Sequence, residues 1–158
     1  MNEHDFTISD FGYAFTAVCE LVPDRTAEGA VITYLPQARY PQAATTPLHA
    51  YGHGPFCRFQ IPASLTGEGV YIISYDEKPL YVGLCQNLAD RFNRGYGLIS
   101  PRNCYRGGQS TNCKINSYVL RETQVGRLLR LLFMSTTQKA TVERKLIAHL
   151  RAPWNGRQ

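Results

Sequence analysis

Two tyrosines in neighbouring apolar segments are the first residues whose types and spacing could do chemistry. Tyr71 closes the tripeptide Gly69-Val70-Tyr71, and Tyr81 opens its near mirror image, Tyr81-Val82-Gly83. A short turn sequence separates the two runs, which predicts an antiparallel hairpin that brings both phenols toward one patch. A glycine beside each tyrosine lets a phosphate group approach the backbone closely. Taken alone, tyrosines that simply pack a core are the more ordinary explanation.

Glu143 is the second candidate, because it falls within the apolar face of the last predicted helix. That face carries Val142, Leu146, Ile147 and Leu150. At about 100° per residue, Glu143 lies inside the same arc. An unpaired buried carboxylate is costly, so it needs a cation, a metal ion or water in a cleft. The sequence leaves a metal site and a salt bridge to an arginine both open.

A proline, a tryptophan and an asparagine follow directly on that helix, at Pro153, Trp154 and Asn155. Trp154 can pin this tail to the body of the protein. The tail would then hold Asn155 against the helix that carries Glu143, although C-terminal tails are more often frayed.

The elements that must position these residues are clearest from residue 69 onward. The predicted order is strand, strand, helix, helix, strand, helix, which gives an α/β (α+β) fold with a small mixed, largely antiparallel three-stranded sheet flanked by helices. Asn87 is the predicted N-cap of the first helix. The expected ranges are strands 70–75, 80–82 and 128–134, and helices 88–94, 110–122 and 138–149.

The chain before this region gives weaker signals. Residues 1–65 are expected to form an accessory region, with a short strand over Cys57–Ile61, and residues 66–158 the main domain. Charge is divided unevenly. Residues 1–68 hold three Lys and Arg against seven Asp and Glu, a net −4, whereas residues 69–158 hold fourteen against five, a net +9. The second value favours a polyanionic partner, most commonly nucleic acid, but charge alone leaves a solvated basic face that binds nothing as an equal alternative.

No apolar run is long enough for a membrane span and no secretory signal is visible, so a cytoplasmic protein without membrane association is expected. Five scattered cysteines, an odd number without a CxxC pair, argue against a disulfide framework. The spacing of His49, His53 and Cys57 leaves a structural zinc site as a minor alternative.

Taken together, the candidate residues resemble the signature of the GIY-YIG nuclease family, which has two such tripeptides, then a helical arginine, a late helical glutamate and an asparagine. Here these are Gly69-Val70-Tyr71, Tyr81-Val82-Gly83, Arg91, Glu143 and Asn155. The resemblance runs from residue 69 to the C-terminus. Many family members carry a histidine or tyrosine where this chain has Gly95; Tyr96 is the nearest substitute, and Tyr105 and Tyr118 are further candidates.

The resemblance implies a metal-dependent endonuclease that hydrolyses DNA phosphodiester bonds with one divalent cation, Mg²⁺ or Mn²⁺, held by Glu143. It implies that Tyr71 takes or relays the proton of the attacking water, with Tyr81 nearby. A free phenol, with a pKa of about 10, needs a cation close by for that role. Arg91 would hold a phosphate oxygen, Tyr96 would supply the supporting hydroxyl, and Asn155 would orient the glutamate side.

The expected nucleic-acid contacts are basic side chains around the predicted loop, together with one glycine of the hairpin: Arg94, Arg102, Arg106, Lys114 and Gly83. DNA is the expected partner, with RNA left open. A restriction-like enzyme would form a homodimer, since one site cuts one strand at a time. A structure-specific or single-strand-specific repair or homing-type nuclease, and a non-catalytic binding module on the same scaffold, are the alternatives.

Overall fold

The structure, a computed structural model, describes residues 5–8 and 11–156. The chain forms two compact units, each drawn from separate stretches of sequence. Unit 1 comprises residues 1–21, 61–91 and 128–158, and unit 2 comprises residues 22–60 and 92–127. This division does not follow the predicted boundary at residue 65. The first 21 residues group with most of the predicted main domain, and residues 92–127 group with the predicted accessory region.

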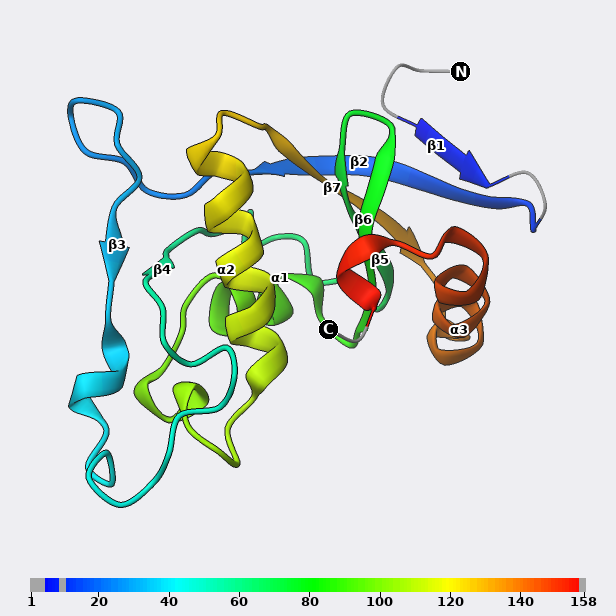
Figure 1. Ribbon diagram of the computed structural model, residues 1–158. Coiled ribbons are helices and arrows are strands. Elements are labelled where there is room, and N and C mark those ends of the chain that lie inside the picture. Colours follow the sequence, from blue (N-terminus) through cyan, green and yellow to red (C-terminus); the bar gives the residue numbers. More distant parts are fainter. Residues whose placement is uncertain (1–4, 9–10, 157–158) are drawn as a thin grey trace. The chain divides into compact units, whose positions relative to one another are not determined.

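Unit 1 is built on a five-stranded antiparallel sheet (Figure 1). Its spatial order is β1 (Asp5–Ile8), β2 (Tyr13–Leu21), β7 (Leu129–Ser135), β5 (Gly69–Tyr75) and β6 (Lys78–Cys85). The predicted strands β5, β6 and β7 and their antiparallel arrangement are confirmed. The prediction of a sheet with only three strands is wrong. The N-terminal hairpin supplies two more, because β2 pairs with β7 from Thr16 opposite Phe133 to Leu21 opposite Leu129.

One helix covers a face of this sheet. Helix α3 (Lys139–Leu150) contacts β6 and β5 (Figure 1). Val142 and Leu146 of α3 are buried in one apolar cluster with Val70, Ile72 and Val82 of the hairpin. The predicted amphipathic face is therefore the one that packs. Within the described residues, no helix combines the length and apolar character that a membrane span requires.

Helix α1 (Leu88–Arg91) follows the hairpin. The predicted N-cap is confirmed, since the side-chain oxygen of Asn87 accepts the Asp90 N–H at 3.0 Å. Beyond Arg91 the helix widens into a π-helix, Phe92–Tyr96, instead of running as an α-helix to Arg94. The tail after α3 forms a short 3₁₀ turn, η4 (Pro153–Asn155), and buries Trp154, so the tail is packed and not frayed.

Unit 2 is organised around helix α2 (Ser110–Gln124), which confirms the predicted second helix. Its other elements are short: β3 (Thr33–Tyr34), η1 (Pro36–Arg39), β4 (Phe56–Cys57) and η3 (Pro101–Cys104). The strand expected over Cys57–Ile61 is thus earlier and shorter. The fully buried Asn116 of α2 ties these pieces together, because its amide nitrogen donates to the backbone oxygens of Cys57 and Tyr96, both at 2.7 Å.

Candidate active site

The hairpin brings the two tyrosines to one face of the sheet. Tyr71 lies opposite Gly83 and Tyr81 lies opposite Ile73, and directly opposed residues of an antiparallel pair project to the same side. The two phenol rings are 6.3 Å apart between centroids, with their planes inclined at 44°. Tyr71 is buried and Tyr81 is half-buried. The predicted convergence of the two phenols is confirmed.

The Tyr71 phenol packs against Gly83, where a side chain would occupy the same space. A Cβ atom at Gly83 would come closer than 3.0 Å to the phenol oxygen and to two ring carbons of Tyr71. Any larger residue would therefore displace the ring. The glycine of the second tripeptide has a packing reason of its own, beyond the close approach of phosphate for which the sequence suggests it.

Glu143 lies partly buried on α3, beside the outer edge of β6. The backbone N–H of Leu84 donates a hydrogen bond to its carboxylate. Burial raises the pKa of this carboxyl above its usual value, and the bond from Leu84 offsets only part of that effect. Among the described residues no ion pair of Glu143 within 4.0 Å is found, so the salt bridge left open by the sequence does not account for it.

Asn155 uses its amide to extend the same strand edge. The side-chain oxygen of Asn155 accepts the Val82 N–H at 2.8 Å, and its side-chain nitrogen donates to the Val82 carbonyl oxygen at 2.9 Å. These two bonds satisfy both outward backbone groups of an edge-strand residue. Asn155 thus binds β6 directly, two residues before Leu84, whose N–H bonds to Glu143.

Arg91, the last residue of α1, lies half-buried near the C-terminal end of β6. Burial raises the pKa of the Cys85 thiol, while a hydrogen bond with Gly69 and the positive charge of Arg91 offset part of this rise. The guanidinium therefore acts electrostatically at Cys85. Three successive β6 residues, Val82, Gly83 and Leu84, thus each contact one candidate side chain, from Asn155, Tyr71 and Glu143 in turn. Arg91 acts on the next residue, Cys85, through its charge, as Lys139 also does.

The remaining predicted residues belong to unit 2 and are described there alone. Tyr96 is buried, with its ring packed edge-on against Phe92 at a centroid distance of 5.1 Å. Its backbone oxygen accepts the Asn116 amide. The predicted nucleic-acid contacts Arg94, Arg102 and Arg106 are exposed. Lys114 is partly buried, and burial lowers the pKa of its ammonium group.

Sequence reasoning missed the backbone of β6 as part of this site. Val82 and Leu84 are apolar and show only strand propensity, so nothing in their side chains reveals that their N–H groups bind Asn155 and Glu143. Their two-residue spacing is the available signal. Alternate residues of an edge strand present their backbone groups to the same open side.

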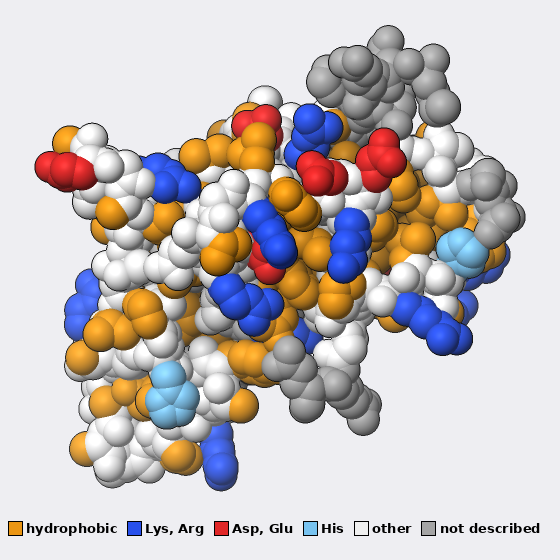
Figure 2. All heavy atoms as spheres, turned by 45° about the horizontal axis from the view of Figure 1, so that its top comes forward, with side chains coloured by type: hydrophobic (Ala, Val, Ile, Leu, Met, Phe, Trp, Pro, Cys, Tyr) orange, Lys and Arg blue, Asp and Glu red, His pale blue; other side chains and the backbone are white. Residues whose placement is uncertain are grey.

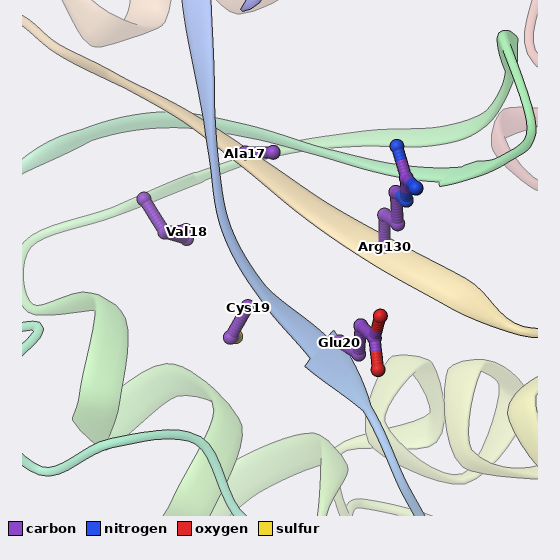
Figure 3. Close-up of a pocket in the computed structure, with 5 residues that line it drawn as sticks. All are labelled: Ala17, Val18, Cys19, Glu20 and Arg130. Atoms are coloured by element: carbon purple, nitrogen blue, oxygen red, sulfur yellow. The ribbon is translucent and has the colours of Figure 1, made fainter. Parts of the chain in front are cut away.

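A shallow hollow of about 230 Å³ lies elsewhere on the sheet of unit 1, between β2 and β7 (Figure 3). Glu20 and Arg130 stand opposite each other across it, and Cys19 lies on its wall. Burial and the neighbouring Glu20 raise the pKa of the Cys19 thiol to about 11. The thiol is therefore protonated near neutral pH and a poor nucleophile, so this hollow holds none of the candidate chemistry.

Glu143 is the side chain that the sequence predicts to hold a metal ion. Across residues 5–8 and 11–156, no group of three or more His, Cys, Asp and Glu side chains gathers to hold a metal ion. The zinc alternative fits poorly, because the ring of His49 contacts the Asn103 carbonyl oxygen and accepts the Tyr51 N–H, and the Cys57 sulfur faces Asn116.

The β5–β6 hairpin carries two neighbouring phenols on one face of the sheet, while Glu143 bonds to the outer edge of β6 from helix α3, which packs against Val70, Ile72 and Val82. Carboxylate, phenol and guanidinium groups are of the types that can polarise water and hold a phosphate. Comparison with protein-family profiles, with curated proteins and with solved structures gives no match to this chain.

Proposed function

We propose that this chain is a nuclease of the GIY-YIG family that hydrolyses phosphodiester bonds of DNA with the help of a divalent cation. The observation that carries the proposal is the set of candidate side chains around β6. Asn155, Tyr71 and Glu143 come from three separate elements, yet they contact three consecutive residues of one edge strand, Val82, Gly83 and Leu84, and the positive charge of Arg91 is felt at the next residue, Cys85. A core made only for stability has no need to gather a carboxylate, a guanidinium and a phenol there.

The residues present fit a single magnesium or manganese ion. Glu143 is partly buried, burial raises the pKa of its carboxyl, and the Leu84 N–H offsets only part of that rise. A cation beside it would restore the charge balance. Magnesium suits a site with one carboxylate, because it keeps most of its water shell and takes its other ligands from substrate phosphate. When bound, the ion would stabilise the extra negative charge that develops on the phosphate.

The chain's own groups divide the remaining work. Arg91 holds a non-bridging phosphate oxygen through charge-assisted hydrogen bonds, which strengthen as charge builds in the transition state. Tyr71 accepts or relays the proton of the attacking water, with its ring fixed against Gly83. Tyr81 is half-buried next to it and donates a hydrogen bond at the reacting phosphate. Asn155 positions the strand edge on which Glu143 rests.

The direct test is incubation of the purified protein with labelled duplex DNA, single-stranded DNA, a flap substrate and RNA, each with Mg²⁺, Mn²⁺ or EDTA. We expect cleavage of DNA that requires the metal and stops in EDTA. Discrete fragments from a plasmid would indicate a sequence-specific enzyme, whereas preference for the flap or single strand would indicate a repair-type or homing-type nuclease. Tight binding without cleavage of any substrate in either metal would contradict the proposal.

A further inference from the structure

Helix α2 of unit 2 exposes one narrow stripe that carries cations and hydroxyl groups. Its members are Ser110, Lys114, Ser117, Arg121 and Gln124, spaced four, three, four and three residues apart. At about 100° per residue they occupy a single arc of the helix. Apart from Thr111 in the first turn, every other residue of α2 is buried. With Thr111, the stripe therefore makes up the outward surface of this helix.

The stripe contains no exposed acid. Glu122, the one carboxylate on α2, is only 8% exposed and pairs with Arg127, whose guanidinium nitrogen lies 2.7 Å from it. Arg121 comes no closer than 4.0 Å to Glu122, and its side chain is 59% exposed. Its charge is consequently available to a partner.

Arg121 is also held in position before any partner binds. Its guanidinium carbon lies 4.7 Å from the centre of the Tyr118 ring, within the range of a cation–π contact. Tyr118 is itself buried and packs edge-on against Tyr51. A cation fixed by a buried ring loses less side-chain entropy on binding than a free lysine would.

Net charge separates between the two units. Residues 22–60 and 92–127 hold nine Lys and Arg against three Asp and Glu, a net +6, while the remainder of the chain holds eight against nine, a net −1. Figure 2 shows Lys and Arg side chains spread over the displayed face. The unit that carries Tyr71, Glu143 and Arg91 thus has no excess positive charge of its own with which to attract a polyanion.

We infer that the α2 stripe, defined by Ser110, Lys114, Ser117, Arg121 and Gln124, binds the phosphate backbone of duplex nucleic acid. The choice of polyanion rests on the proposed function; the location of the surface rests on charge and exposure. The hydroxyl groups of Ser110 and Ser117 and the amide of Gln124, on the same stripe as the two cations, match the donors that commonly contact phosphates. Lys114 and Arg121 are about 10 Å apart along the helix axis, a span that covers about three phosphates of one strand.

The chemistry of the stripe favours a duplex over a single strand. Single-strand binders stack bases on exposed aromatic rings. On α2 the one aromatic side chain, Tyr118, is 6% exposed and lies beneath Arg121. The stripe therefore grips the backbone and leaves the bases unread.

The test compares two double variants that remove equal charge from different helices. Lys114→Gln with Arg121→Gln alters the stripe, and Arg144→Gln with Lys145→Gln alters exposed cations of α3 in unit 1. Binding to labelled duplex DNA, duplex RNA and single-stranded DNA is measured in EDTA across a salt series. Thermal unfolding confirms that each variant is folded; Glu122 keeps its partner Arg127 in the first.

For duplex DNA we expect the stripe variant to lower the slope of log K against log salt by about two, since each lost phosphate contact removes about 0.9. The α3 variant should keep the parent slope. An unchanged slope in the stripe variant, an equal loss in both variants, or tighter stripe-dependent binding of single strands would overturn the inference. Metal-dependent cleavage by the parent protein, scored separately, decides the proposed function independently of these slopes.

Discussion

At the scale of single residues, Glu143 is the group that we propose as the metal ligand. Burial raises its pKa, which means that the folded protein holds the carboxyl proton more tightly than the unfolded chain does. The ionised carboxylate therefore costs stability. That cost is absent below the ordinary pKa of glutamate and grows as pH rises from there through the raised value.

Replacing Glu143 by Gln should remove this cost while keeping an oxygen that accepts the Leu84 N–H. In EDTA we expect the Glu143→Gln variant to unfold at a higher temperature than the parent protein at pH 7, and at the same temperature below pH 4, where both side chains are neutral. Thermal unfolding followed by circular dichroism across this pH range measures the difference. A variant that is less stable at pH 7 would mean that the carboxylate is already well compensated within the protein.

Magnesium should change the relative thermal stability of the parent protein and the Glu143→Gln variant. Because the metal binds only the ionised carboxylate, added Mg²⁺ should stabilise the parent protein at pH 7 and leave the variant unaffected, and its effect should fade as pH drops through the raised pKa. Equal stabilisation of both proteins would place metal binding elsewhere.

At the scale of elements, strand β6 is the part on which the site depends. As an edge strand it has outward N–H and C=O groups to satisfy, and the tail and α3 supply partners for them. The protection of an exposed edge and the placement of candidate catalytic groups are thus achieved by the same hydrogen bonds.

Asn155 tests this link between the tail and the strand. Asn155→Ala leaves the N–H and C=O of Val82 without their partners, so we expect a loss of about 1–3 kcal/mol in the free energy of unfolding, measured by urea denaturation. Asn155→Asp should be destabilised at neutral pH, because a carboxylate oxygen then faces the Val82 carbonyl, and should recover as pH falls and the acid regains a proton to donate. Loss of activity at full stability in either variant would instead indicate a direct role at the reacting phosphate.

Local patterns predicted the helices and the hairpin because their periods are local. The apolar arc of α3, the cap at Asn87 and the strand runs of β5 and β6 can each be recognised within a few residues. The π-helix after Arg91 could not be recognised in that way. It depends on the Gly97 N–H reaching back five residues to the Phe92 carbonyl oxygen, at 2.7 Å, a choice set by packing in unit 2.

At the scale of the whole molecule, both units are assembled from distant stretches of chain. Strand β2 joins the sheet by pairing with β7, which lies more than a hundred residues later. The sequence of a strand does not show which distant strand it pairs with. For this reason the sequence predicts an accessory region for residues 1–65, although β2 belongs to the main sheet. The sequence also could not show that the positive charge is concentrated in unit 2, because this unit combines residues from both sides of the predicted boundary.

This interleaving predicts the behaviour of a truncated chain. A fragment of residues 66–158 lacks β2, so the edge of β7 and its apolar face would be exposed. We expect the fragment to be insoluble or to lack a cooperative thermal transition, whereas removal of residues 1–8, which deletes only the edge strand β1, should leave a cooperative transition at lower temperature. A fragment that melts cooperatively at the parent temperature would show that β5, β6 and β7 suffice for the fold.

The most direct measurement is the rate of plasmid cleavage in Mg²⁺ by the parent protein and by Glu143→Gln, at protein concentrations that give equal DNA binding. The parent protein should cleave, and the variant should lose at least about a thousandfold in rate while binding DNA as tightly, because it lacks the carboxylate that holds the metal. Cleavage by Glu143→Gln at the parent rate, or by the parent protein in EDTA, would contradict a metal-assisted nuclease site at the edge of β6.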